Sequence, residues 1–215
     1  MTKQIIIALL AFFPCTLPAQ DGWVAQLFMG SATNAHTPLV IRQDGYADIN
    51  FIARYSEQPF YEAPYYLWRI GKWKNNKAWE LEMIHHKLIL QNPPPEVQSF
   101  SVSHGYNLVT VNRAWQKGKV IYRLGAGAVL AHPESEVRNQ LFENVTGGQF
   151  GNGQFYWSGI TAQAAVERRF QLRGKWHWSL EAKATASYAR VPIANGTADM
   201  PNTALHGVLG IGRSW

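Results

Sequence analysis

The residues of this sequence that could perform chemistry gather in the segment Ser103-His104-Gly105-Tyr106-Asn107. A histidine can act as a general base near neutral pH, and a serine that it activates becomes a nucleophile for acyl transfer. A carboxylate that orients the imidazole completes such a site, and Glu80, Glu82 and Glu181 are available for that role. The candidate catalytic residues are therefore His104, Ser103 and Glu82.

The spacing within this segment argues against a complete catalytic site. Neighbouring residues on a strand point to opposite faces, so Ser103 and Ser101 can reach His104 only where the backbone is irregular. Tyr106 lies two residues from His104, but a phenol is a poor nucleophile for ester hydrolysis. A simpler alternative holds if the fold is a barrel: His104 then belongs to a hydrogen-bonded network in the barrel lumen.

A second histidine-bearing segment is His85-His86, which follows Glu82. Only one of two adjacent strand residues can face a common site, and a further ligand such as His104 would have to come from the next strand. The single cysteine, Cys15, lies within the first twenty residues, which excludes a disulfide or a cysteine-based metal site from the rest of the chain. We therefore expect no metal site and no cofactor.

These residues belong to a chain in which apolar and polar side chains alternate with a period of two, the pattern of β-strands with two different faces. The clearest case runs from Trp176 to Tyr188, where one face is apolar with an aromatic residue at each end and the other face is polar. Soluble strands average only ~5–6 residues. Aromatic girdles at both ends of an apolar row are typical of membrane-spanning β-barrels, so the alternation predicts an antiparallel transmembrane barrel.

Other segments alternate in the same way, over residues 65–74, 77–90, 119–131 and 155–170. In the second of these, Trp79 and Leu81 are predicted to face outward. The phase of the apolar residues changes near His85-His86, which places Leu88 and Leu90 outward as well, and a similar change is centred on Gly105. Single-residue phase changes of this kind predict β-bulges.

Charged residues of both signs lie on the faces opposite the apolar rows, where they would point into a barrel. An eight-stranded barrel has an interior just wide enough for side chains to fill, so opposed charges would pair there and plug the lumen. The predicted lumen network consists of Arg69, Glu80, Arg123, Glu167, Arg169, Glu181 and Lys183.

The first twenty residues have the layout of a secretory signal peptide. Lys3 precedes an apolar run from Ile5 to Phe13, and small residues follow near Ala19. The run is shorter than the ~20 apolar residues of a membrane-spanning helix. We therefore expect residues 1–20 to be removed on export and residues 21–215 to form a single barrel domain.

The composition fits a barrel wall better than a nucleic-acid-binding protein. Aromatic residues make up 13% of the chain and charged residues only 16%, where a quarter is usual for charged residues. The net charge of +6 is explained by basic side chains near anionic lipid headgroups. Because the sequence contains no run of Lys and Arg, we expect no nucleic-acid partner.

The connections between strands fall into two classes. Tight turns are predicted at Asn75-Asn76, Lys117-Gly118 and Arg173-Gly174. Longer links are predicted over 91–98, 132–153 and 191–202. Outer-membrane barrels have short periplasmic turns and long external loops, so the longer links are expected outside the cell.

The N-terminal third leaves the number of strands open. Residues 22–31 form one predicted strand, and residues 37–42 and 46–55 form a hairpin. The barrel has eight strands if this hairpin is an external extension and ten if it joins the wall. An odd number is excluded because both termini must lie in the periplasm. We favour eight.

The order of these segments resembles the superfamily of small outer-membrane β-barrels typified by the OmpA transmembrane domain. The matching features are a glycine-rich first strand, PYYLWRIGKW (64–73), WELEMIHHK (79–87) and the terminal aromatic Trp215. The resemblance implies a Gram-negative outer-membrane location among lipid and lipopolysaccharide, and recognition of Trp215 by the barrel-assembly machinery. It does not imply a function, because this fold hosts several.

The segment around His104 also resembles, in part, the outer-membrane lipid A deacylases. In that family a histidine is followed two residues later by the nucleophilic serine and then by asparagine. Here Asn107 matches, but Tyr106 stands in the place of the serine. This departure puts deacylase activity in doubt.

As the function, we expect a non-enzymatic, monomeric barrel with a plugged polar lumen and a structural or surface-recognition role. Two alternatives remain open. One is a lipid A-modifying hydrolase centred on His104, and the other is a narrow, porin-like pore or carrier for small molecules.

Overall fold

The computed structural model describes residues 21–61, 64–143, 148–149 and 154–215, so the predicted signal peptide lies outside the described residues. No helix among these residues is long and apolar enough to cross a membrane. They contain thirteen strands. Their bounds are β1 (Gly22–Asn34), β2 (Thr37–Gln43), β3 (Ile49–Ala53), β4 (Tyr55–Ser56), β5 (Tyr66–Lys74), β6 (Lys77–Leu90), β7 (Val97–Lys117), β8 (Val120–Ala131), β9 (Glu134–Val137), β10 (Gln140–Phe142), β11 (Tyr156–Gln171), β12 (Trp176–Ile193) and β13 (Gly196–Ser214).

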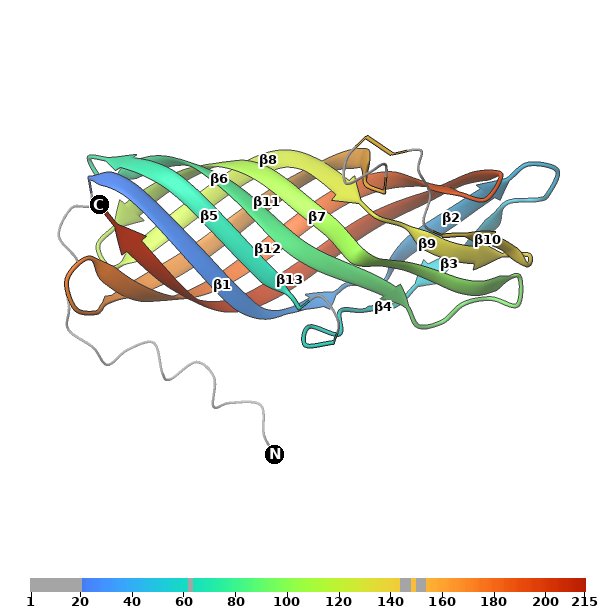
Figure 1. The fold of residues 1–215 in the computed structure, drawn as a ribbon, viewed down its shortest axis with the longest axis horizontal. Coiled ribbons are helices and arrows are strands. Elements are labelled where there is room, and N and C mark those ends of the chain that lie inside the picture. The colour runs from blue at the N-terminus through green and yellow to red at the C-terminus, as the bar shows by residue number, and fades with distance from the viewer. Residues whose placement is uncertain (1–20, 62–63, 144–147, 150–153) are drawn as a thin grey trace, which may run out of the picture.

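Within the described chain, eight strands close into an antiparallel barrel (Figure 1). The order around the ring is β1-β5-β6-β7-β8-β11-β12-β13. The first and last strands complete it, pairing from Val24 with Ser214 to Asn34 with Ala204. The eight-stranded prediction is confirmed, and the ten-stranded alternative is wrong because β2 and β3 do not enter the ring.

The predicted tight turns lie at the end of the barrel where the chain ends (Figure 1). Asn75 and Asn76 both have positive φ angles, of 53° and 61°, as in the hairpin turns whose twist matches that of the flanking strands. The backbones of Trp23 and Trp215 exchange two hydrogen bonds at this end, of 3.2 and 3.0 Å. The described N-terminal strand and the C-terminus therefore lie beside the tight turns, as the sequence predicted.

The outer face of the ring is apolar. Exposed aliphatic side chains come from every part of the wall and include Leu27, Ile70, Leu81, Val111, Leu124, Ile160, Leu180 and Leu209. At the tight-turn end, basic side chains lie over aromatic rings, as with Lys72 over Trp23 and Arg113 over Trp79. An apolar band flanked by aromatic and basic groups is the outer surface that a lipid bilayer requires, so the fold is a transmembrane β-barrel.

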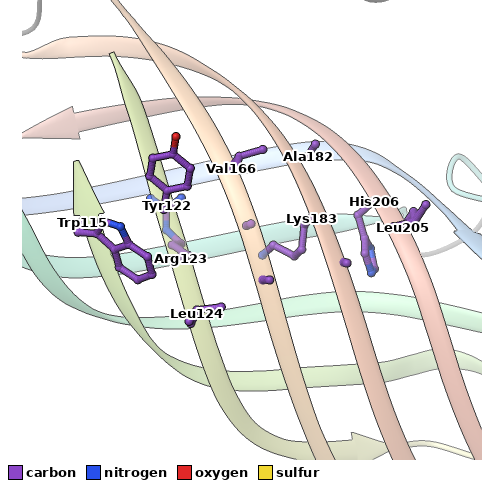
Figure 2. Close-up of a pocket in the computed structure, with 12 residues that line it drawn as sticks. Trp115, Tyr122, Arg123, Leu124, Val166, Ala182, Lys183, Leu205 and His206 are labelled. Atoms are coloured by element: carbon purple, nitrogen blue, oxygen red, sulfur yellow. The ribbon is translucent and has the colours of Figure 1, made fainter. Parts of the chain in front are cut away.

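A shallow hollow of about 480 Å³ in the wall is lined by residues of β7, β8, β11, β12 and β13 (Figure 2). Its floor contains the small side chains of Ala164, Ala182 and Ala184, and larger groups such as Tyr122 and Leu205 flank it. Acyl chains of the surrounding lipid can fill a depression of this kind.

Beyond the ring, the strands continue into a β-extension at the end opposite the tight turns (Figure 1). In it, β2 pairs with β13 and with β3, β4 pairs with β6, and β9 pairs with β7 and β10. Its interior is apolar and contains the buried side chains of Leu39, Ile41, Leu88, Val102 and Val191.

Two sequence predictions about this region are wrong. Leu88 and Leu90 do not face outward but are buried in the apolar interior of the extension. Residues 191–202 are not a loop, because β12 and β13 continue through them and turn at Asn195, which has a φ of 53°. Asn195-Gly196 provides a tight hairpin turn here. The pairing does shift register between His86 and Leu88, but the additional residues lie on β7, because His86 pairs with Tyr106 and Leu88 with Val102.

Ala184 lies within the outward apolar row of β12, and we expect Ala184→Arg to destabilise the barrel in a bilayer. The loss should be about 2–4 kcal/mol, the cost of an arginine at the bilayer midplane. Urea unfolding in phosphatidylcholine vesicles measures it. Ala184→Leu, which keeps an apolar group on the same face, is the control and should change stability by no more than about 0.5 kcal/mol. Equal stability of the arginine variant and the wild type would show that this row does not face lipid.

Candidate functional site

The structure brings all seven residues of the predicted lumen network together inside the barrel, and Glu82 joins them. In the described part of the chain, the cluster contains four cationic and four carboxylate side chains, so its formal charge is zero. The cations are Arg69, Arg123, Arg169 and Lys183, and the carboxylates are Glu80, Glu82, Glu167 and Glu181.

Two arginines connect strands from opposite sides of the ring. Arg69 on β5 donates two hydrogen bonds of 2.8 Å to Glu181 on β12. Arg123 on β8 donates to Glu80 at 2.5 Å and to Glu181 at 2.8 Å. Lys183 contacts Glu82. Because each of these charges is buried and faces opposite charge, the cluster can remain ionised without bulk water.

Aromatic rings cover the network at both ends. The Arg69 guanidinium lies 5.0 Å from the centre of the Phe28 ring, and the Arg169 guanidinium lies 4.9 Å from that of Trp73. Phe28 belongs to the apolar core toward the extension, whereas Trp73 belongs to a smaller apolar cluster with Val24. The lumen is therefore filled along this part of its length.

Glu82 does not accompany His104, contrary to the sequence-based catalytic set. Its side chain is fully buried in the lumen, where it binds Arg69 and Lys183. The side chain of His104 is 52% exposed on the outer face of the wall. The alternative that His104 lies in the lumen network is therefore also wrong.

An irregularity in β7 turns His104 outward. Gly105 has a φ of 135°, a backbone conformation that favours glycine. On one side of it Tyr106 pairs with Ala131, and on the other Ser101 pairs with Glu134, so four residues of β7 lie opposite two residues of the neighbouring segment. The His132 N–H donates to the Gly105 carbonyl at 3.0 Å. This irregular segment supports the predicted bulge at Gly105.

Four polar side chains meet at this point, which we call the rim cluster: Ser103, His104, His132 and Glu134. His104 Nδ1 lies 3.0 Å from Glu134 Oε1, and the Ser103 hydroxyl donates to Glu134 Oε2 at 2.9 Å. The rings of His104 and His132 have their centres 5.2 Å apart. Burial lowers the pKa of the His132 imidazole, and Glu134 opposes that effect only in part.

The rim cluster does not have the geometry of a catalytic triad. Ser103 Oγ lies 3.2 Å from His104 Nδ1, the nitrogen that also faces Glu134. An acyl-transfer triad requires the nucleophile and the carboxylate on opposite nitrogens of the imidazole. Tyr106 offers no alternative, because its hydroxyl is directed to Ser187 at 3.0 Å.

A groove of about 380 Å³ adjoins the rim cluster on the outer face of the wall. It is lined by His104 together with Tyr66, Met83, His85, Asn107, Val109, Leu130 and Phe155. His85 stacks on Tyr66 with ring centres 5.0 Å apart, and its Nδ1 lies 2.9 Å from Asn107 Oδ1. Sequence reasoning missed His132 and Glu134, although the triplet His132-Pro133-Glu134 directly follows a predicted strand.

Comparison with protein-family models and with the curated proteins gave no match. Among solved structures, the chain is similar to Ail, the attachment invasion locus protein of Yersinia pestis, with a TM-score of 0.44 and 10% identity over 91% of this chain and 100% of that one. It is also similar to Neisserial surface protein A, with a TM-score of 0.43 and 10% identity over 90% of this chain and 97% of that one. A third similar structure is that of the outer membrane protein AlkL, with a TM-score of 0.46 and 12% identity over 95% of both chains. Such low identities carry no information on function.

Removal of one lumen charge should destabilise the barrel strongly. We expect Arg123→Met to cost about 3–5 kcal/mol, because it leaves buried carboxylates without a counter-charge. Chemical unfolding in detergent micelles measures the loss. Arg213→Met is the matched control, because Arg213 lies over the outward Trp176 ring. This substitution should lower the free energy of unfolding by about 1 kcal/mol or less.

A second variant separates charge from packing in the same network. Adding Glu80→Gln to Arg123→Met removes one of the uncompensated carboxylates, so the double variant should be more stable than Arg123→Met alone. A double variant that is less stable would mean that Arg123 acts by filling space rather than by neutralising charge.

Proposed function

We propose that this chain is an outer-membrane barrel with a closed lumen whose role is to display the external extension at the cell surface. The observation that carries the proposal is the neutral, fully buried charge cluster across the lumen. A conducting pore requires a continuous polar path, and here arginine and glutamate side chains bind each other across that path. The filled interior favours an anchor over a pore or carrier.

Side-chain contacts join the two hairpins of the extension. Arg138, in the turn between β9 and β10, donates to the Ala47 carbonyl at 2.8 Å and to Gln43 Oε1 at 3.2 Å. Its guanidinium also lies 4.6 Å from the centre of the Tyr46 ring. These contacts join the β9–β10 hairpin to the β2–β3 hairpin. A preorganised surface of this kind loses little conformational entropy when it binds a partner.

The surface of the extension carries exposed apolar side chains that are not part of the outer face of the barrel wall. Phe60 is 79% exposed and Tyr61 is 64% exposed, and Leu141 and Ile52 are also exposed. Aromatic residues are enriched at protein interfaces. They support a recognition role for the extension, with a protein or the outer lipid surface as the partner.

Single cysteines test this topology cleanly, because Cys15 is the only natural cysteine and lies in the predicted signal peptide. We expect Glu96→Cys, at the exposed link between β6 and β7, to react with a membrane-impermeant maleimide on intact cells. Lys119→Cys, in an exposed tight turn, should react only after the outer membrane is permeabilised. Reaction of both cysteines on intact cells, or of the turn cysteine alone, would contradict the proposed orientation.

The hydrolase centred on His104 is the second candidate function, favoured only by the contact between His104 and Glu134. Loss of a general base costs about 10²–10⁴-fold in rate. Because the cluster lacks triad geometry, we expect lipid A from cells producing the wild type and from cells producing His104→Asn to have the same mass. Mass spectrometry of lipid A makes the comparison. Loss of an acyl chain that depends on the wild-type protein and stops in the variant would establish the hydrolase.

A further inference from the structure

The rim cluster contains three side chains of the kinds that bind transition metals. His104 comes from β7, His132 follows β8, and Glu134 begins β9, and their potential ligand atoms all lie within 4.8 Å of one another. Two imidazoles with one carboxylate form a donor set typical of zinc sites that keep one position open. We propose that His104, His132 and Glu134 bind a zinc ion on the outer face of the barrel.

The distances agree with a single tetrahedral ion. Zinc–nitrogen and zinc–oxygen bonds of about 2.0–2.1 Å place neighbouring ligand atoms about 3.3 Å apart. Glu134 Oε1 lies 3.0 Å from His104 Nδ1 and 3.9 Å from His132 Nε2. The third separation, between the two histidine nitrogens, is within 4.8 Å, and side-chain rotation would have to bring all three to about 3.3 Å. The donor set also selects against calcium and magnesium, which prefer oxygen ligands.

The surroundings already orient the ligands. The Ser103 hydroxyl donates to Glu134 Oε2, which leaves Oε1 directed toward the two histidines. Hydrogen bonds to a ligating carboxylate are a general feature of metal sites. The His132 ring is also fixed, because it packs edge-on against Phe155 with ring centres 5.2 Å apart. Ser103 is therefore a positioning residue for the site.

The backbone around Gly105 holds the ligands in place. Gly105 has a φ of 135°, and a Cβ atom added there would lie 2.4 Å from the Asn107 side-chain nitrogen, so a substitution would strain the backbone and displace Asn107. The same segment is tied to His132 through the Gly105 carbonyl. The first histidine of the site is therefore fixed relative to the second by the main chain.

A second polar group lies in the groove beside the cluster. His85 is only 5% exposed, and its Nε2 atom is buried without a hydrogen-bond partner in the described structure. Its other nitrogen is held by Asn107. Both His85 and His104 line the groove of about 380 Å³. The open position of the zinc ion would face this groove, where a water or an anionic oxygen of an outer-leaflet lipid can bind.

Zinc binding by the full barrel tests the proposal. The protein is refolded in detergent without a histidine tag and titrated with Zn²⁺ against a chromophoric chelator. We expect one tight site in the wild type, its loss in His132→Ala and in Glu134→Gln, and about 10–100-fold weaker binding in Ser103→Ala. Heat-modifiable migration on gels shows that each variant is folded.

His36→Ala is the matched control, because His36 is an exposed histidine in the link between β1 and β2. It should bind zinc as tightly as the wild type. The proposal is overturned if the wild type binds zinc no more tightly than His132→Ala, or if His36→Ala loses the site as well.

Discussion

The closed hydrogen-bonded ring is the constraint on which the rest of this structure depends. In hydrocarbon an unpaired backbone amide or carbonyl costs several kcal/mol, so β1 must find a partner, and it pairs with β13 along its whole spanning length. Closure with eight strands also fixes the width of the lumen, which side chains alone can fill. Long inward residues such as Arg69 and Arg123 must then find their partners among other side chains, and the balanced cluster with the glutamates follows.

The long strands lie partly in the bilayer and partly in the extension, where water surrounds them. This difference explains why the sequence-based prediction for Leu88 and Leu90 was wrong. In the bilayer the apolar side chains face outward, as Leu81 does; in the extension the outside is water, and Leu88 and Leu90 face inward. Even-numbered residues of β6 remain on the inner face throughout. The apolar residues of β6 change phase near His86 because the strand leaves the bilayer there and enters the extension. The pairing with β7 is also irregular at this point.

The barrel could be predicted because its signal is local. Alternation within β12 shows which side chains face lipid, and the opposite positions yield Glu181 and Lys183 as lumen residues. The partners across the lumen could not be predicted in this way, since Arg69 reaches a residue 112 positions away. The rim cluster was missed for the same reason: His132 and Glu134 reach His104 only through the pairing of β9 with β7 and the unusual backbone at Gly105.

The two polar clusters differ in what their surroundings allow them to do. Each lumen carboxylate is held by arginine or lysine, so Glu82 belongs to this network of ion pairs despite its favourable chemistry. On the outer wall, the cost of a charged side chain falls from about 2–4 kcal/mol at the bilayer midplane to about 0–1 near the interface. The rim, where the wall meets the extension, is thus the level at which outward histidines and a glutamate are tolerated. The polar side chains around His104 lie at that level, whereas the charged side chains of the lumen bind each other.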